Sequence, residues 1–293
     1  MSWKDLEPPL AVVIPARNVE HLLPECLSAL LGQLRADDQL VLVDDSSNDG
    51  TAGVAERLGA RVIRRDSAGG PYAARNDGWR ATTQPYVLFT DARCIANEKL
   101  LDRVREAASR GPDLIFGEMG VRTGLRIAER VAAERQHLRV APYSADSFLP
   151  FFPTACLTVR REALEAVGGF RIVDSGGDAD LCWRIQLSGM RKIHEITEPV
   201  MEWRPRATVV ALLQQWAKYG RSSAWLRHEF RSRGATAPTP RPTIRIVAGY
   251  VIRLLRRIVE RKAKDVRVIV VTTLADLACD VSYARAMRAL RRG

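Results

Sequence analysis

Short apolar runs alternate with stretches of helical spacing in the first part of the chain. The run at 87–89 ends at Thr90 and Asp91, as a buried parallel strand ends in a polar loop. The strand and helix patterns repeat about every dozen residues, which predicts an α/β fold with a mostly parallel sheet and helices on both faces. The predicted strands are 10–15, 39–43, 61–64, 87–90 and 113–118, and the predicted helices are 21–33, 51–58, 72–81 and 98–110.

The pattern is less regular after residue 118. The predicted helices there are 125–140, 161–167 and 179–187, the strands are 156–159, 191–193 and 200–203, and 141–153 is a loop. We expect one domain over 1–234, with a nucleotide-binding half (10–118) and an acceptor and catalytic half (119–234). Three prolines mark a linker at 235–243, which leaves a helical tail at 244–293.

The tail has the pattern of a basic amphipathic helix, with apolar side chains on one face and arginines on the other. Such a helix suits the surface of an anionic membrane, and the alternative is a helix packed on the domain with a solvated basic face. The apolar segment 266–278 is a candidate to pair with it as a hairpin. The apolar positions are Ile244, Val247, Val251, Leu254, Leu255 and Ile258, and the arginines are Arg245, Arg253, Arg256, Arg257 and Arg261.

Composition narrows the expected location and partners. The chain is 46% hydrophobic and 27% charged, as ordinary globular proteins are, and much of its net charge of +11 falls after Arg204. Five cysteines without metal-like spacing indicate reduced thiols. No secretory pattern opens the chain, and no apolar run reaches about 18 residues. We therefore expect a cytoplasmic protein, peripheral on the inner face of the membrane. Few aromatic residues interleave with the arginines, so we expect no nucleic-acid partner.

Charged residues gather where predicted strands end. Asp45 follows the second strand, Asp91 and Arg93 follow the fourth, and Arg75 lies in the helix after the third. Strand ends of an open α/β sheet converge on one edge, where ligands bind. A carboxylate suits ribose hydroxyls or a base N–H, and an arginine fork suits a diphosphate. The alternative for the 87–94 segment alone is a strand that ends in a solvated turn.

Five motifs in this order resemble those of family 2 glycosyltransferases with the GT-A fold. The similarity covers about residues 10 to 206 and implies a Rossmann-like, mostly parallel sheet, with the C-terminal amphipathic helices as an addition. The motifs are Val12–Asn18, Leu42–Thr51, Ala74–Gly78 (Ala-Arg-Asn-Asp-Gly), Phe89–Arg93 in the place of the Asp-x-Asp segment, and Gly168–Phe170 followed by Gly176–Arg184.

The resemblance implies a role for each matched residue. The donor would be a nucleotide-sugar, and Asp178 would be the general base that deprotonates an acceptor hydroxyl, which then attacks the anomeric carbon and inverts it. For Asp178 the alternative is a helix N-cap, whereas Asp180 is expected to pair with Arg184 one turn on. The implied donor-binding residues are Pro15, Ala16, Asn18, Asp45, Arg75, Asp91 and Arg93.

Three positions depart from the family pattern. Arg93 stands in place of the second acid of Asp-x-Asp, Trp203 in place of a histidine, and Gly177 in place of a glutamate. An arginine repels a hard cation. We therefore expect no metal cofactor and infer that Arg93 supplies the positive charge at the diphosphate. Mg²⁺ or Mn²⁺ held by Asp91 is the alternative.

Two other functions fit part of the pattern. A degenerate GT-A protein would bind a nucleotide or a partner without turnover, but Asp45, Arg75, Asp91 and Asp178 are all retained. Nucleotidyl transfer would need a Gly-rich basic segment after the first strand, which Ala16–Asn18 is not. The basic tail favours a lipid or lipid-linked acceptor. The segment Gln214-Gln215-Trp216 lacks the Gln-x-x-Arg-Trp of polymerising members, so we expect transfer of a single sugar.

Overall fold

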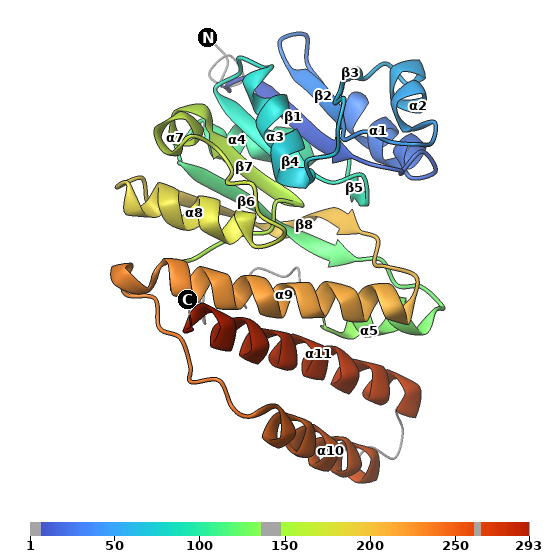
Figure 1. Ribbon diagram of the computed structural model, residues 1–293. Helices are drawn as coiled ribbons and strands as arrows, with labels where there is room; N and C mark the ends of the chain where they lie inside the picture. The colour runs from blue at the N-terminus through green and yellow to red at the C-terminus, as the bar shows by residue number, and fades with distance from the viewer. Residues whose placement is uncertain (1–6, 136–147, 261–264, 293) are drawn as a thin grey trace. The chain divides into compact units, whose positions relative to one another are not determined.

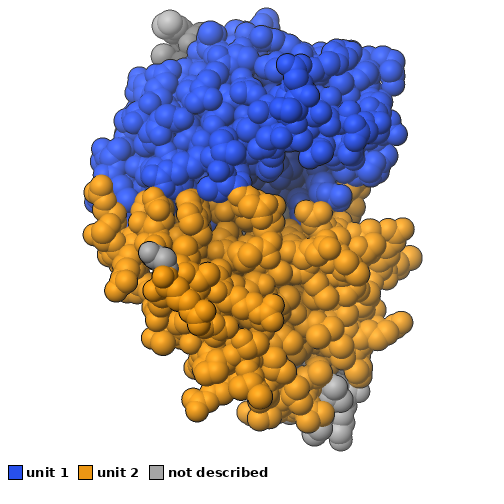
Figure 2. All heavy atoms as spheres, viewed as in Figure 1, with its two compact units in different colours: residues 1–120, 138–173, 177–203 blue, residues 121–137, 174–176, 204–293 orange. Residues whose placement is uncertain are grey.

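The computed structural model describes residues 7–135, 148–260 and 265–292, with the side chains of 257–260 excepted. The chain forms two compact units, which Figure 2 distinguishes by colour. Unit 1 comprises the described residues within 1–120, 138–173 and 177–203, and unit 2 those within 121–137, 174–176 and 204–293. These boundaries differ from the division suggested at 234 and 244. The assignment of functions to parts of the chain stays a prediction.

Unit 1 contains an eight-stranded sheet with the order β3-β2-β1-β4-β7-β6-β8-β5 (Figure 1). Its strands β1 to β4 pair in parallel, and the predicted α/β class with a mostly parallel sheet is confirmed. The strands are β1 (Leu10–Ala16), β2 (Gln39–Asp44), β3 (Arg61–Arg64), β4 (Tyr86–Thr90), β5 (Cys94–Ala96), β6 (Leu114–Val121), β7 (Cys156–Arg160) and β8 (Ile193–Trp203).

The central parallel strands β1 and β4 are almost entirely apolar, as strands covered by helices on both faces are. Residues 10–14 of β1 and 87–89 of β4 have no exposed surface, so side chains on both faces are buried. On one face α3 lies so close to β1 and β2 that a Cβ at Gly78 would come 2.4 Å from a methyl of Val13. The helices of unit 1 are α1 (Leu23–Leu31), α2 (Thr51–Arg57), α3 (Pro71–Arg80), α4 (Leu100–Ala108), α7 (Arg161–Val167) and α8 (Gly177–Leu187).

Two strands of unit 1 differ from the sequence prediction. The strands predicted at 191–193 and 200–203 are one strand, β8, which continues through Pro199. The short strand β5 was not predicted, because three residues carry too little pattern to be recognised. It pairs antiparallel with β8, so that Cys94 lies opposite Trp203. This pairing extends the sheet directly after Asp91.

Unit 2 consists of helices: α5 (Ile127–Arg135), α9 (Val209–Glu229), α10 (Thr243–Glu260) and α11 (Val266–Leu290), with a 3₁₀ turn at Arg231–Arg233. The predicted helix 125–140 is α5 as far as Arg135, and residues 136–140 lie outside the described part. The predicted loop 141–153 likewise lies partly outside it. Helix α9 was not predicted. Its Gly220 crosses the backbone of Cys279 in α11, and Ala128, Leu212 and Val268 form a shared core of α5, α9 and α11.

Helix α10 has two apolar stripes. Ile246 and Tyr250 pack against Ala284 of α11, which confirms the predicted hairpin contact. The predicted outer stripe is largely exposed, with Ile244 at 79% and Leu255 at 60% of their full exposure. The side chains of Arg257 and Ile258, and Arg261 as a whole, lie outside the described residues. Among the described helices, none is both long and apolar enough to cross a membrane.

Candidate active site

The carboxyl ends of β1 and β2 bring together four of the predicted donor-binding residues. Ala16 O accepts a 2.8 Å hydrogen bond from Asp45 N. Asn18 has a left-handed backbone (φ 53°), and its Oδ1 accepts from Asn48 N at 2.8 Å. Asparagine tolerates this conformation better than most residues. Pro15 is a partly exposed residue of β1. These residues form the rim of the sheet edge at which ligands of open α/β sheets bind.

Asp45 is buried and fixes the loop that leads into α3. Its Oδ1 accepts from Gly69 N at 2.9 Å and from Arg65 at 2.5 Å, and its Oδ2 accepts from Gly70 N at 2.8 Å. Burial by itself would raise the pKa of Asp45, but the two N–H donors and the Arg65 cation outweigh it and hold the pKa below its ordinary value. Asp45 therefore stays ionised and sets the position at which α3 begins.

The ion pair between Arg75 and Asp91 joins α3 to the end of β4. The guanidinium Nη2 of Arg75 donates to Asp91 Oδ1 at 2.5 Å. Arg75 is 3% exposed, whereas the Asp91 side chain is 35% exposed and can still meet a ligand. The guanidinium also lies 5.5 Å from the ring centre of Tyr72 and 6.0 Å from that of Phe170. It is thus a buried cation held in place on three sides.

Asp178 lies in the first turn of α8, in the electrostatic reach of Arg75 and Asp91. Because the helix begins at Gly177, Asp178 is its second residue and not an N-cap, and its Oδ1 accepts from Ala179 N at 3.1 Å. Burial raises its pKa and Asp91 adds to the rise, while Arg75 and the nearby N–H groups oppose it. A carboxylate with a raised pKa is a better proton acceptor at neutral pH than an ordinary aspartate.

A rigid support surrounds this acid. Phe170 N donates to Asn76 Oδ1 at 2.9 Å, and Asn76 Nδ2 donates back to Phe170 O at 2.8 Å. Arg184 pairs with the fully buried Asp180 at 2.8 Å, as predicted, and donates to Gly169 O at 2.8 Å. The Gly-Gly-Phe and Asp-x-x-x-Arg segments of the sequence are therefore joined physically to α3.

Two of the departures from the family pattern are Arg93, in the turn before β5, and Trp203, at the end of β8. Residues 91–94 form a turn in which Cys94 N donates to Asp91 O at 2.9 Å, and Cys94 lies opposite Trp203 in the β5–β8 pair. Each departure replaces a residue that could ligate a metal. Arg93 is therefore the residue just before the one that pairs with Trp203.

The residues present do not fit a bound divalent cation. Asp91 is the one acid of this turn, and its carboxylate is already paired with the Arg75 cation. Within the described part of the chain, no three acidic, cysteine or histidine side chains are grouped as metal ligands. A hard cation requires several oxygen ligands, which this turn does not offer.

Two residues of the site were not recognised from the sequence. Arg65 pairs with both Asp45 and Asp77, and its position just after β3 satisfies the same strand-end criterion that singled out Asp91. Tyr72 is 7% exposed and lies one helical turn before Arg75. Residues at this spacing share a face of a helix, so the spacing could have placed Tyr72 beside Arg75.

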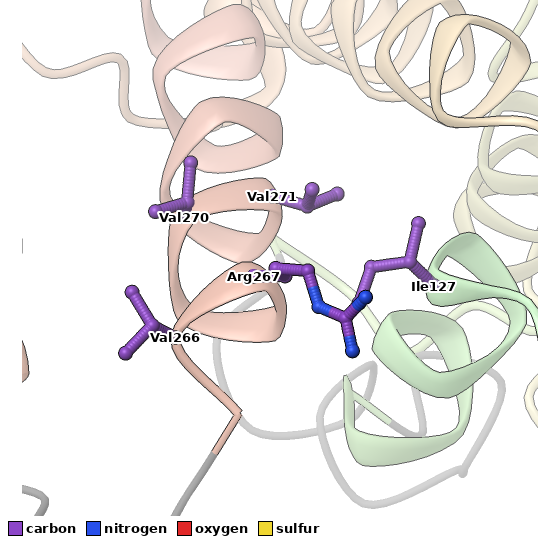
Figure 3. Close-up of a pocket in the computed structure, with 5 residues that line it drawn as sticks. All are labelled: Ile127, Val266, Arg267, Val270 and Val271. Carbon is purple, nitrogen blue, oxygen red and sulfur yellow. The ribbon is translucent and has the colours of Figure 1, made fainter.

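Unit 2 has an apolar groove that none of these residues lines. It has a volume of about 380 Å³ and is bordered by Ile127 of α5 and Val266, Val270 and Val271 of α11. Figure 3 shows the Arg267 side chain extending across it towards Ile127. The groove is therefore separate from the residues predicted to bind the donor.

The sequence pattern of Glycosyl transferase family 2 matches residues 11–168, which is more than half of the chain. The chain belongs to this family of glycosyltransferases. The predicted family and enzyme class are therefore confirmed.

Two mycobacterial relatives show how far the similarity reaches. The pre-mycofactocin glycosyltransferase of Mycobacterium tuberculosis is 30% identical over 199 residues, which cover 64% of this chain and 41% of that protein. A PGL/p-HBAD biosynthesis glycosyltransferase of Mycobacterium bovis is 34% identical over 128 residues, covering 40% of this chain and 48% of that protein. The chain thus spans less than half the length of these relatives.

Solved structures share the fold at low identity. A mannosyltransferase of Pyrobaculum calidifontis, in complex with GDP-Man and Mn²⁺, has a TM-score of 0.60 at 20% identity over 97% of this chain and 85% of its own. Glucosyl-3-phosphoglycerate synthase of M. tuberculosis, in complex with Mn²⁺ and UDP, has a TM-score of 0.58 at 21% identity over 82% of this chain and 86% of its own. These likenesses confirm the GT-A fold.

Proposed function

We propose that this protein transfers one sugar from a nucleotide-sugar to an acceptor hydroxyl with inversion, and that Asp178 is the general base. The observation that carries the proposal is the cluster of Arg75, Asp91 and Asp178 beyond the carboxyl end of β4. It combines a buried cation for a diphosphate with an acid whose pKa is raised by burial. Asn18 supplies the neighbouring rim for the nucleoside, and Asp45 holds the loop beside it through Gly69 and Gly70.

The chemistry follows from these groups. The acceptor oxygen forms a bond to the anomeric carbon as the bond from that carbon to the diphosphate oxygen breaks. Asp178 takes the proton of the acceptor hydroxyl, so the negative charge leaves on the nucleoside diphosphate. A single displacement of this kind inverts the anomeric centre. Arg75 and Arg93 stabilise the diphosphate charge as it develops, and Arg75, which Asp91 already holds in place, needs little reorganisation.

Replacement of the proposed general base, Asp178, tests the proposal directly. Asp178→Asn should lower turnover by about 10²–10⁴-fold, because the amide cannot accept the proton. Donor binding, measured by thermal shift with a panel of UDP- and GDP-sugars, should remain. Asp174→Asn is a matched control, since Asp174 is an exposed carboxylate of the adjacent loop that pairs with Lys218 at 2.7 Å. Unchanged turnover in Asp178→Asn would refute the assignment of the base.

Metal independence is a second part of the proposal. Arg93 in place of an acid and the engagement of Asp91 with Arg75 both oppose a cation at the diphosphate. We expect transfer to continue in the presence of EDTA. Activity that EDTA abolishes and Mg²⁺ or Mn²⁺ restores would refute this part. Donor binding without any turnover in either condition would favour the alternative, a degenerate family member.

We propose that the acceptor is a lipid or lipid-linked molecule and that α10 contacts an anionic membrane. The exposed stripe of α10 supports this, because Ile244, Val251 and Leu255 are 79%, 51% and 60% exposed, and Arg256 beside Leu255 is exposed too. An apolar stripe beside arginines suits a helix lying in a lipid surface. The opposite stripe holds the helix on α11 through Ile246 and Tyr250.

Vesicle binding of the full chain tests the membrane contact. The double variant Val251→Gln/Leu255→Gln should lose most co-sedimentation with phosphatidylglycerol vesicles, and added salt should weaken the binding of the unaltered chain. Leu125→Gln is the matched control, because Leu125 is 99% exposed but lies outside α10. Equal vesicle binding by the double variant and the unaltered chain would remove α10 from the proposal.

A further inference from the structure

Tyr72 lies between the buried cation and the proposed base. It is the second residue of α3, and its ring stacks on the ring of Phe170, with 5.6 Å between ring centres and 25° between planes. The Arg75 guanidinium is 5.5 Å from the centre of the same ring. At 7% exposure Tyr72 has little contact with solvent. Its side chain is therefore fixed by neighbours on two sides.

The third side of the ring is occupied by the start of α8. A Cβ added at Gly177 would lie 2.7 Å from Cζ of Tyr72 and 2.8 Å from its Cε1. These distances are too short for any side chain, so the backbone of Gly177 rests directly on the hydroxyl end of the ring. This contact gives a physical reason for the glycine that stands in place of the family's glutamate: Tyr72 fills the space that a larger residue would need.

The hydroxyl of Tyr72 also meets the backbone at the first turn of α8. The backbone of Gly177 lies against the hydroxyl end of the ring, and the N–H groups of Gly177 and Asp178 lower the pKa of Tyr72, against the larger effect of burial. The first N–H groups of a helix have no partner within the helix, so a buried helix start needs an acceptor. Burial raises the pKa of Tyr72 far above its ordinary value, so that the hydroxyl stays neutral.

We propose that Tyr72 is a positioning residue for Asp178: it holds the first turn of α8 at a fixed distance from Arg75, so that the base faces the acceptor while the cation faces the diphosphate. The proposal deepens the proposed transfer reaction and rests on it. Tyr72 touches neither the reacting atoms nor the donor in this role. It sets the relative placement of two groups that come from α3 and α8.

The variant Tyr72→Phe removes the hydroxyl and keeps the ring with its stacking. We expect turnover to fall by about 10-fold to 100-fold with the donor KM unchanged, because a small misplacement of a reacting group has effects of this size. We also expect the acidic limb of the pH profile to move to lower pH, because a looser first turn of α8 lets water reach the Asp178 carboxylate and relieves the burial that raises its pKa. A variant that only lowered the stability of the protein would leave the acidic limb of the pH profile unchanged.

Tyr86→Phe is the matched control. Tyr86 is 4% exposed and its hydroxyl donates to Pro112 O at 2.9 Å, so this change also removes one buried hydroxyl. It should lower stability without moving the pH profile. Gly177→Ala, which places a methyl against the Tyr72 ring, should reduce turnover as Tyr72→Phe does.

Two outcomes would overturn the inference. Full turnover in Gly177→Ala would show that the ring is not fixed against α8. A pH profile of Tyr72→Phe identical to that of the unaltered protein would show that the hydroxyl does not act on Asp178. If Asp178→Asn itself keeps full turnover, the proposed function fails. If Asp178→Asn is inactive but Tyr72→Phe and Gly177→Ala behave as the unaltered protein does, only the positioning role is refuted.

Discussion

Arg75 is the side chain through which most of the candidate site is connected. It pairs with Asp91, acts on Asp178 through its charge, and lies near the rings of Tyr72 and Phe170. A buried cation of this kind is stable only because its neighbours compensate for the loss of water. Its planar guanidinium is also the group best suited to two phosphate oxygens at once.

Arg75→Lys should therefore be a severe change at this position. A lysine keeps the charge but loses the fork and the flat surface between the two rings. We expect donor affinity to fall by at least about tenfold, which corresponds to about 1.4 kcal/mol. Calorimetric titration with the preferred nucleotide-sugar measures it. Arg80→Lys on the same helix, where the arginine is exposed, should bind donor as the unaltered chain does.

The lowered pKa of Asp45 leads to a prediction of how the stability of the protein depends on pH. Its pKa is lowered on folding, so its contribution is fully present above the unfolded pKa, near 4, and is lost as pH falls through the folded pKa. The stability difference between the unaltered protein and Asp45→Asn should thus be largest at neutral pH and shrink below about pH 4. Urea unfolding at several pH values measures this difference. A difference that stays constant with pH would contradict the role of the charge.

The sequence indicated most of these residues but not their contacts. Strand ends singled out Asp45, Asp91 and Arg93, and the Ala-Arg-Asn-Asp-Gly motif singled out Arg75. The engagement of Asp45 with Gly69 and Gly70 depends on the path of a loop that no local pattern specifies.

At the scale of elements, α9 and α11 depend on one close crossing. A Cβ at Gly220 would lie 2.1 Å from the carbonyl oxygen of Cys279 and 3.0 Å from Tyr283 N. These are backbone atoms, which cannot rotate away as a flexible side chain can. Glycine is therefore required at this position by the partner helix, although it weakens an isolated helix.

Gly220→Ala should destabilise the protein by about 1–3 kcal/mol, as other overpacked contacts do. Thermal unfolding followed by circular dichroism measures this. Gly249→Ala in α10 is the matched control, because nothing lies within 4 Å of a Cβ there. That change should stabilise the helix by about 0.5–1 kcal/mol. Equal effects of the two changes would contradict the tight crossing.

Element predictions succeeded where the pattern was regular. Helix 161–167 was predicted with its observed bounds, while α9 was not predicted. Its 21 residues mix four buried positions with many half-buried ones, because it packs against helices on more than one side. A helix of this kind has no single clear apolar face.

At the scale of the whole molecule, the tail is not an appendage that can be removed without effect. Val268 and Val271 of α11 complete a core with Ala128, Val131 and Leu212, the last three of which have no exposed surface. A chain that ends at Gly234 would expose this core to water.

Truncation after Gly234 should therefore lower the unfolding temperature and solubility of the whole protein. The comparison with the full chain can be made by calorimetry and by light scattering at equal concentration. The α10 variant Val251→Gln/Leu255→Gln should keep the full unfolding temperature, since both side chains are largely exposed. A truncated chain that melts with the full chain would show that unit 2 does not need α11.

The sequence by itself determined the α/β class and the family resemblance and predicted residues of a donor site, because strand-end position and motif order are local properties. Only the tertiary structure decided the pairing of Arg75 with Asp91, the opposition of Cys94 and Trp203, and the contact of Tyr72 with Gly177. It also decided which stripe of α10 is exposed. These features join segments far apart in the chain, and their geometry follows from packing rather than from any local spacing.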